Sequence, residues 1–415
     1  MAHINTRMTI PVQAGIVFGI FFITSCAQLG LTGNEPRSNE TSTPSEINRQ
    51  LEQVNERLGE DPGDTGLQKE KADLLYAITR DLDDPLLRKP YYRNLRELHD
   101  TNLQMGTETP EGVEQVISRA WSTEQGAGVE LLQASRDAAE TEAVTIEDDR
   151  ISAHFENAII LRPDSLSTYN LLANTYYLSG DLTSAIETLD RALQVPESDN
   201  PDLRERLAYL YLESGDIERS IDLYRTLAEQ YPQRDHMRHG LANALMINNE
   251  HDEAIGILRD LAEEFATRFE YREALAVQLY YRFSATVEKL QDPGEPSAAD
   301  EDQLTELRSM AAEIDDLLTG LEENLPLSEE QLFRSAVIYR DISDIFFELS
   351  QLADESERGE LESLRAEYLQ KALSPLEKLA ETNPENREYI RTLYDAYRDL
   401  EMDDEADNLE RTYNL

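Results

Sequence analysis

Side chains that could do chemistry are present, but their spacing defines no reaction. His236 and His239 lie one helical turn apart and could share a metal ion, yet the sequence fixes no third ligand. Acidic neighbours such as Asp315 and Asp316 are inevitable among 84 acidic residues, so they carry little catalytic information. No HExxH, GxSxG or glycine-rich phosphate loop is found. The sequence therefore predicts no enzyme: we expect no catalytic residue, no metal and no cofactor.

The only cysteine, Cys26, stands directly after a segment with the three parts of a secretory signal. Arg7 and the amino terminus supply positive charge, an apolar run covers residues 14–23, and small residues follow. The apolar run is shorter than the roughly 20 residues that a membrane-spanning helix needs. Residues 23–26, Ile-Thr-Ser-Cys, resemble the lipobox of bacterial lipoproteins. This resemblance implies a signal peptide at 1–25 and lipidation of Cys26, whereas the alternative is an ordinary signal with a chance cysteine.

The residues after Cys26 bear on where such a lipoprotein would sit. No aspartate follows the cysteine, and the resemblance to Gram-negative lipoproteins then favours the outer membrane, with the folded part facing the periplasm. The stretch from 26 to 46 is polar and rich in Ser, Thr, Gly and Pro, which predicts a flexible tether. A random coil of the residues 30–46 spans on the order of 20–25 Å.

The body of the chain repeats with a period of 34 or 35 residues. Small residues recur at two positions of each unit, where a bulky side chain would push two crossing helices apart. The first set is Ala173, Ala208, Ala242 and Ala276, and the second is Ala185, Ser220 and Ala254. Gly180, Gly215 and Asn249 fall between the helices, where a left-handed residue ends the first helix. Apolar residues recur at i, i+3, i+4 and i+7 on both helices.

These features over residues 164–266 resemble the tetratricopeptide repeat, a 34-residue helix–turn–helix unit. The resemblance implies an all-α fold, a right-handed superhelical solenoid of antiparallel helix pairs. The signature tryptophan is absent, with Tyr169 near its place in the first unit. Because each repeat stacks on its neighbours, such a solenoid can bury a sufficient core without disulfides.

Outside those three clear units the pattern weakens. We expect a helical region with degenerate repeats at 47–163, expanded helix hairpins at 267–384 and a C-terminal repeat or capping unit at 385–415, whose turn carries Glu401 in place of glycine. Ser328 is the expected cap of one long helix. Loops are expected near 106–111 and 142–149. The individual helices expected in these regions are 67–80, 90–105, 269–290, 302–324, 328–353 and 357–381.

The inner face of the solenoid, formed by the first helix of each pair, is the surface most able to bind a partner. The residues expected there mix tyrosine, asparagine and methionine, as in grooves that bind peptides or helices. Some of them could equally be packing or plain surface residues. They are Asn170, Asn174, Tyr177, Glu205, Tyr209, His239, Asn243, Met246, Glu273, Val277, Tyr280 and Tyr281.

Charge narrows the class of partner. The net charge of −46 disfavours nucleic acid, whose phosphates would be repelled. Some tetratricopeptide domains clamp a chaperone's terminal carboxylate with Lys, Arg and Asn; here Asn174 and Asn243 would fit, but basic groove residues are missing. Glu205 and Glu273 stand in the groove instead, so we expect a neutral or basic protein or peptide. The acidity could also reflect a high-salt habitat, since the acidic residues spread along the whole chain.

Three functions remain open from the sequence. The first is a lipid-anchored scaffold that binds protein or peptide through the groove. The second is a fixed subunit of an outer-membrane assembly, secretion or pilus machine. The third, an enzyme or glycan-binding lipoprotein, would place its site at 46–150, where Trp121 is the only tryptophan.

Overall fold

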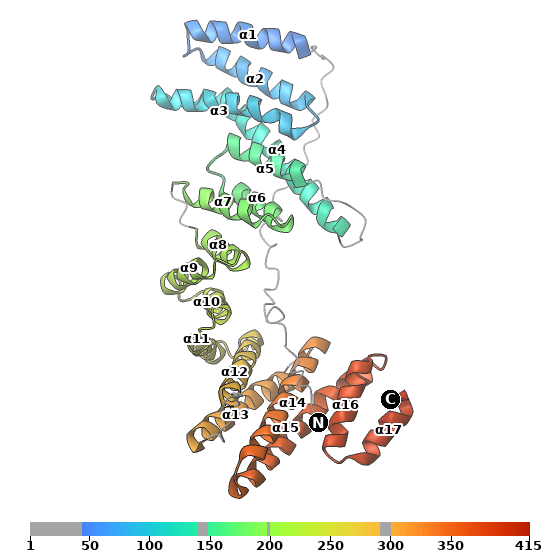
Figure 1. Ribbon diagram of the computed structural model, residues 1–415. Helices are drawn as coiled ribbons and strands as arrows, with labels where there is room; N and C mark the ends of the chain where they lie inside the picture. Colours follow the sequence, from blue (N-terminus) through green and yellow to red (C-terminus); the bar gives the residue numbers. More distant parts are fainter. Residues whose placement is uncertain (1–43, 140–147, 197–199, 291–299, 325) are drawn as a thin grey trace. The chain divides into compact units, whose positions relative to one another are not determined.

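The computed structural model describes residues 44–139, 148–196, 200–290, 300–324 and 326–415. Within these ranges the chain forms seventeen α-helices and one short 3₁₀ turn, η2, and contains no strand (Figure 1). Consecutive helices pack against one another as antiparallel pairs, which confirms the expected all-α repeat architecture. The expected signal peptide, Cys26 and the tether up to residue 43 lie outside the described residues.

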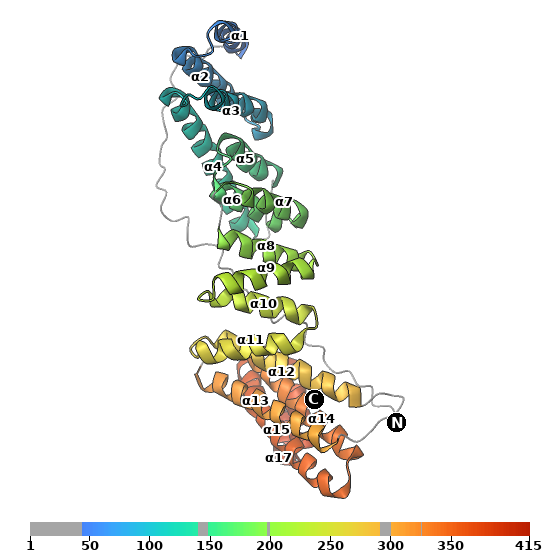
Figure 2. The same ribbon diagram turned by 90° about the vertical axis from the view of Figure 1, so that its left-hand side faces the viewer.

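The described helices divide between two compact units, which meet in sequence between residues 231 and 232. In the N-terminal unit the successive pairs stack so that each helix contacts its sequence neighbours (Figure 2). Its elements are α1 (Pro44–Glu60), α2 (Thr65–Asp81), η2 (Pro85–Arg88), α3 (Lys89–Gln104), α4 (Glu111–Ala139), α5 (Asp148–Leu161), α6 (Leu166–Leu178), α7 (Leu182–Leu193), α8 (Pro201–Glu213) and α9 (Ile217–Gln230).

The C-terminal unit contains the longest helix hairpins of the described chain. The pair α14 and α15 makes the most extensive helix–helix contact, followed in this unit by α12 with α13. Its elements are α10 (Asp235–Ile247), α11 (His251–Glu264), α12 (Phe269–Leu290), α13 (Glu301–Asn324), α14 (Glu329–Leu352), α15 (Glu355–Thr382), α16 (Arg387–Asp399) and α17 (Asp403–Tyr413).

The turns inside the repeats adopt the predicted left-handed conformation. Gly180, Gly215 and Asn249 have φ values of 82°, 83° and 63°, and Glu401 has 58°. After each of them the next backbone N–H donates to a carbonyl five residues back; Asp181 N, for example, lies 2.9 Å from Tyr176 O. This bond satisfies a carbonyl that the helix end would otherwise leave without a donor. The same closing geometry recurs between the helices of four pairs, α6–α7, α8–α9, α10–α11 and α16–α17.

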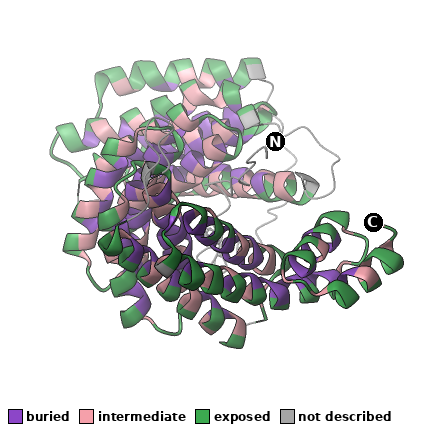
Figure 3. Cartoon of the chain, turned by 60° about the horizontal axis from the view of Figure 1, so that its bottom comes forward, coloured by how far each residue is buried: buried purple, intermediate pink, exposed green. Residues whose placement is uncertain are grey.

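Small side chains lie where helices cross, as the sequence predicts. Every residue of the two small sets is buried, with Ala208, Ala242, Ala254 and Ser220 all fully inaccessible. In the N-terminal unit, larger apolar side chains pack around Ala173 and Ala185 and form a continuous core between helices α4 to α8. Figure 3 shows the buried residues along the faces where helices meet and the exposed residues on the opposite faces. Helix-period patterning therefore accounts for the packing.

The six helices that the sequence predicts individually are all present, and helix α4 was not predicted. The predictions at 67–80, 90–105, 269–290, 302–324, 328–353 and 357–381 correspond to α2, α3, α12, α13, α14 and α15. Ser328 caps α14 through a reciprocal pair of hydrogen bonds with Gln331. Helix α4, 29 residues long, had no counterpart among the expected helices, and α1 begins at Pro44, inside the range expected for the tether. Among the described residues, no helix is both long enough and apolar enough to span a bilayer.

Candidate functional site

The twelve predicted groove residues divide between the two units, five in the N-terminal unit and seven in the C-terminal unit. In the N-terminal unit the side chains of Tyr177 (α6) and Tyr209 (α8) meet across the helices. Their hydroxyl oxygens are 3.0 Å apart, and their rings meet edge to face with centroids 6.0 Å apart. Both side chains are partly buried. The structure therefore brings together two phenols that the sequence placed 32 residues apart.

A second polar contact joins the same two helices. Arg206 Nη1 donates a hydrogen bond to Asn170 Oδ1, so the amide of α6 holds the guanidinium of α8. Burial lowers the pKa of Arg206 to about 10, although the carboxylates of Glu205 and Asp202 oppose this shift. The guanidinium is therefore still charged at neutral pH. The sequence argument that the groove lacks basic side chains is wrong at this point.

Tyr209 stays neutral over the physiological range. Burial, the hydrogen bond with Tyr177 and the nearby charge of Glu213 raise the pKa of Tyr209 far above its usual value. A neutral phenol both donates and accepts hydrogen bonds, whereas a phenolate only accepts. We call the surface formed by these two helices the α6–α8 face; its residues are Asn170, Asn174, Tyr177, Glu205, Arg206 and Tyr209.

In the C-terminal unit the charge of Glu273 is already compensated. Its carboxylate accepts hydrogen bonds from Gln331 Nε2 at 2.7 Å and from the guanidinium of Arg334, both on α14. The Arg334 side chain is only 10% exposed, so this is a largely desolvated ion pair. An acidic residue held in this way offers little attraction to a basic partner. The inference that Glu273 favours a basic ligand therefore loses its support.

Three of the predicted groove residues in this unit are core residues instead. Asn243, Val277 and Tyr280 are 2%, 8% and 5% exposed. The hydroxyl of Tyr280 donates to Asp341 Oδ2 at 2.5 Å, which turns that side chain toward α14 rather than toward solvent. These positions were expected on the inner face because they continue the repeat register. Residues of α13 and α14 surround Val277, and α14 holds the hydroxyl of Tyr280.

The other predicted residues of the C-terminal unit are half-buried. His239 lies edge to face against the ring of Tyr271, with centroids 5.1 Å apart, and burial lowers the pKa of His239 to about 4. Tyr281 packs against the ring of Tyr280 at 5.7 Å, and Met246 lies near the end of α10. His239 is therefore an uncharged packing residue at neutral pH, and no charge on it attracts a partner.

The two chemical alternatives gain no support from the geometry. His236 Nδ1 lies 3.7 Å from Asp235 Oδ1, but the described residues contain no cluster of three His, Cys, Asp or Glu side chains that could hold a metal. Trp121 packs against the core of α2–α5, and the guanidinium of Arg162 lies 5.8 Å from its ring centroid. An arginine over the indole leaves that part of the ring unavailable for stacking on a sugar.

Sequence reasoning missed both arginines of these surfaces, for two different reasons. The repeat register places Glu205 on the inner face. Arg206 is the next residue, so the register places it on the side of the helix rather than on the inner face. Its long side chain nevertheless extends across to α6. Arg334 lies outside the three clear repeats and 61 residues from Glu273, so no local signal linked the two. A search for basic residues one position away from the inner register would have found Arg206.

Comparison with known families identifies the repeat. Residues 166–199 and 211–277 each match a family model described as tetratricopeptide repeat. The chain carries tetratricopeptide repeats. These repeats are scaffolds that bind proteins or peptides, and the chain contains a scaffold of that kind. The matches cover the region that the sequence pattern marks most clearly. No relative of the chain was found among curated proteins.

Solved structures with similar helical repeats are distant. Pseudomonas aeruginosa pilF is 11% identical and matches over 65% of this chain and 99% of its own, with a TM-score of 0.38. YrrB, a tetratricopeptide protein with an unusual peptide-binding site, is 13% identical over 48% of this chain and 91% of its own, with a TM-score of 0.32. The human IFIT1 dimer with m7Gppp-AAAA is 12% identical over 90% of this chain and 95% of its own, with a TM-score of 0.35. At these identities and scores the likenesses say nothing about the partner of this chain.

Proposed function

We propose that this tetratricopeptide scaffold is anchored by a lipid on Cys26 at the periplasmic side of the outer membrane and binds a protein or peptide segment on its α6–α8 face. The anchoring rests on the lipobox-like Ile-Thr-Ser-Cys sequence and the missing aspartate after it. The binding surface rests on the geometry of the N-terminal unit. The two parts of the proposal are tested separately below.

The observation that carries the binding surface is the contact of Tyr177 with Tyr209. The two rings support each other, so binding needs little further ordering of either side chain. Each hydroxyl can exchange a hydrogen bond with a peptide group, and each ring can pack on an aliphatic or proline side chain. Tyrosines of this kind are enriched at the energetic centres of interfaces. The face thus suits an extended polypeptide segment.

Charge on this face favours a neutral or basic segment. Glu205 lies on the same helix as Tyr209, one turn before it, and Glu213 lies one turn after it. The positive charge of Arg206 is already engaged by Asn170 and by the fields of Glu205 and Asp202. The excess of 84 acidic over 38 basic residues adds a long-range field of the same sign. An acidic segment would be repelled before it reached the tyrosines.

Selection of displayed random peptides on the full chain, followed by fluorescence anisotropy of single peptides, tests the binding surface. Tyr209→Ala should weaken binding about tenfold, the usual effect of truncating a central interface tyrosine. Tyr394→Ala, which removes a half-buried tyrosine from α16 in the other unit, is the matched control and should bind like the wild type. Equal affinity in Tyr209→Ala and the wild type would show that the α6–α8 face is not the binding surface.

The anchor is tested with Cys26→Ser. The lipidated chain should float with outer-membrane vesicles, and the N-terminal peptide of the mature protein should carry the mass of its acyl chains. Because two or more acyl chains give stable anchoring, the serine variant should be recovered in the soluble fraction. Recovery of Cys26→Ser in the membrane fraction would rule out the cysteine as the anchor.

A further inference from the structure

The turn η2 presents two neighbouring leucines to solvent. Leu86 is 53% exposed and Leu87 is 57% exposed, and no other two consecutive large hydrophobic residues in the described part of the chain are exposed to this degree. Single exposed leucines are ordinary on protein surfaces, but an adjacent pair on a protruding turn is a small apolar patch. The two leucines belong to the N-terminal unit and precede the helices of the α6–α8 face in the sequence.

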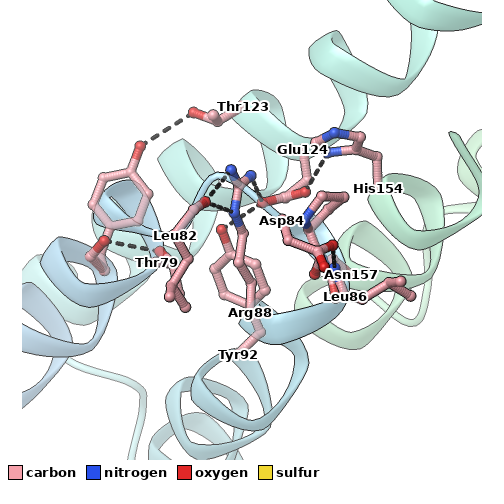
Figure 4. Close-up of polar contacts among 12 residues, drawn as sticks. Thr79, Leu82, Asp84, Leu86, Arg88, Tyr92, Thr123, Glu124, His154 and Asn157 are labelled. Atoms are coloured by element: carbon pink, nitrogen blue, oxygen red, sulfur yellow. Dashed lines mark hydrogen bonds and ion pairs between the residues drawn. The ribbon is translucent and has the colours of Figure 1, made fainter. Parts of the chain in front are cut away.

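Hydrogen bonds from the loop's own side chains and from α5 hold the backbone that carries these leucines (Figure 4). The guanidinium of Arg88 donates twice to the carbonyl of Leu82, at 2.9 and 2.6 Å, and closes the loop on itself. From α5, Asn157 Nδ2 donates to the carbonyl of Pro85 at 2.8 Å. Asp84 Oδ1 accepts from the backbone N–H of Leu86 at 2.9 Å. The turn therefore displays its leucines in one conformation.

A buried carboxylate secures this arrangement. Glu124 on α4 is fully inaccessible and accepts hydrogen bonds from Arg88 Nη1 at 2.9 Å and from Tyr92 at 2.6 Å. His154 Nδ1 lies 2.6 Å from its other oxygen. Burial alone would raise the pKa of Glu124, but hydrogen bonds from His154, Tyr92 and Arg88 lower it below the usual value. The carboxylate is charged at neutral pH, and its hydrogen bond with Arg88 holds that side chain in place beside the turn.

The exposed leucines lie at the end of the α1–α2 hairpin where α1 begins. Helices α1 and α2 pack against each other and are joined by a short turn, so they run antiparallel. Pro44, the first residue of α1, and η2, which follows α2, therefore lie at the same end of this hairpin. Figure 1 shows α1 and α2 lying side by side. Seventeen residues, 27–43, separate Pro44 from Cys26. A lipid on Cys26 would hold this end of the unit near the bilayer.

The charges beside the leucines indicate which lipids suit them. Asp81, Asp83 and Asp84 flank the turn and are exposed. Arg80, just before them, is also exposed, whereas Lys89 is engaged by Glu156 at 2.6 Å, so the charge beside the turn is net negative. Exposed carboxylates next to the patch oppose contact with an anionic surface and tolerate a zwitterionic one. The leucine side chains favour contact with a bilayer, and the aspartates limit that contact to bilayers without net negative charge.

We propose that Leu86 and Leu87 insert into the headgroup region of a zwitterionic bilayer and form a second membrane contact beside the lipid on Cys26. This inference rests on the lipid anchoring proposed above. Two contacts at one end of the unit would fix the orientation of that unit relative to the membrane, which a single flexible tether cannot do.

The test uses the lipidated full chain in phosphatidylcholine vesicles. Cys26 is the only native cysteine, and its sulfur is blocked when it carries lipid, so Leu87→Cys introduces one site for the environment-sensitive fluorophore NBD. NBD at this position should shift to the blue on vesicles and be quenched by nitroxide lipids. Leu103→Cys is the matched control: Leu103 is 56% exposed and lies at the far end of α3, roughly 21 Å from the start of that helix at 1.5 Å per residue. NBD at position 103 should keep the emission wavelength that it has in water.

The outcomes separate the two proposals. A wild-type chain that reacts with the thiol probe and fails to float with vesicles would overturn the lipid anchor and this inference with it. A chain that floats while NBD at position 87 behaves like NBD at position 103 would overturn only the second membrane contact. Anionic phosphatidylglycerol in the vesicles should reduce the blue shift, and an increase would contradict the assigned lipid class. Shielding that occurs in native membranes but not in pure lipid would identify a protein occupant and overturn the inference.

Discussion

Glu124 and His154 form a buried pair, with 2.6 Å between the carboxylate oxygen and Nδ1 of the ring. Glu124 is fully inaccessible and His154 is 5% exposed, yet they lie in a region where the sequence shows only degenerate repeats. Together with Arg88 and Tyr92 they link η2, α3, α4 and α5 through one carboxylate. A polar cluster of this kind fixes one relative arrangement of helices that lack a regular repeat pattern.

Glu124→Gln should destabilise the N-terminal unit by about 3 kcal/mol, because removing one partner leaves Arg88 buried without its counter-charge. Urea unfolding followed by circular dichroism measures the change. Asp73→Asn is the matched control: it breaks the exposed pair with Lys69, in which both side chains are about half-exposed. That variant should lose no more than about 1 kcal/mol. Equal losses in the two variants would contradict the structural role of Glu124.

The same carboxylate predicts how stability changes with pH. The pKa of Glu124 is lowered in the folded chain from its ordinary value of 4.5, so folding favours the ionised form. Its contribution is fully present above the unfolded pKa and is lost as the pH falls through the folded pKa. The difference in unfolding free energy between wild type and Glu124→Gln should therefore shrink as the pH falls below the ordinary carboxyl value of 4.5. A constant difference down to the acid limit would argue against a lowered pKa.

Several features of the fold follow from local sequence signals. Gly180, Gly215 and Asn249 close their helices as predicted, because the left-handed conformation depends mainly on the residue that adopts it. Ala208 and Ala242 are buried where predicted, because the 34-residue register puts equivalent positions at equivalent helix crossings. In both cases the signal is carried by residue type and spacing alone.

The features that the sequence did not predict depend on long-range contacts. Three glycines, Gly112, Gly126 and Gly128, interrupt the helical pattern of α4, and α4 is held by packing against α5 rather than by propensity. The groove prediction failed for Tyr280 because a residue 61 positions later, Asp341, accepts its hydroxyl. Repeat register identifies which face a residue is on, but not whether another helix covers that face.

Glu401→Gly should stabilise the C-terminal unit. Glu401 has a φ of 58°, where a residue with a Cβ is strained and glycine is not. The gain should be about 1 kcal/mol, visible as a higher midpoint in thermal unfolding. Gly215→Ala, the reverse exchange at the equivalent turn, should lose a similar amount. A lower midpoint for Glu401→Gly would show that the glutamate side chain contributes more than the backbone strain costs.

Two glycines of α4 should respond in opposite directions to the same substitution. A Cβ at Gly128 would lie 2.7 Å from the ring of Phe155, which is fully buried, whereas nothing lies within 4 Å of a Cβ at Gly126. Gly128→Ala should therefore cost about 1–3 kcal/mol through overpacking. Gly126→Ala should gain up to about 1 kcal/mol from helix propensity. Chemical unfolding of both variants measures the difference, and stabilisation by Gly128→Ala would contradict the close packing of α4 on α5.

The two glutamates predicted to attract a basic partner should differ in their effect on binding. Glu273 is held by Arg334 and Gln331, so its charge is compensated before any partner arrives. Glu205 lies one turn before Tyr209 on the α6–α8 face. The charge of Arg206 offsets its field in part, but the exposed carboxylate of Glu213, one turn after Tyr209, leaves this face net negative. Glu205→Gln should therefore weaken binding of a basic peptide several-fold and reduce the dependence of its affinity on salt. Glu273→Gln should leave both unchanged.

Titration of peptides that differ only in net charge, at low and high salt, measures this contrast between Glu205 and Glu273. Glu187→Gln, which removes an exposed carboxylate from the outer helix α7, is the control for the loss of one negative charge. A contact effect requires Glu205→Gln to weaken binding more than this control does, because the long-range field changes equally in both variants. If both variants weaken binding alike, the acidity acts only through the net charge of −46, and the α6–α8 face does not select its partner by a local carboxylate.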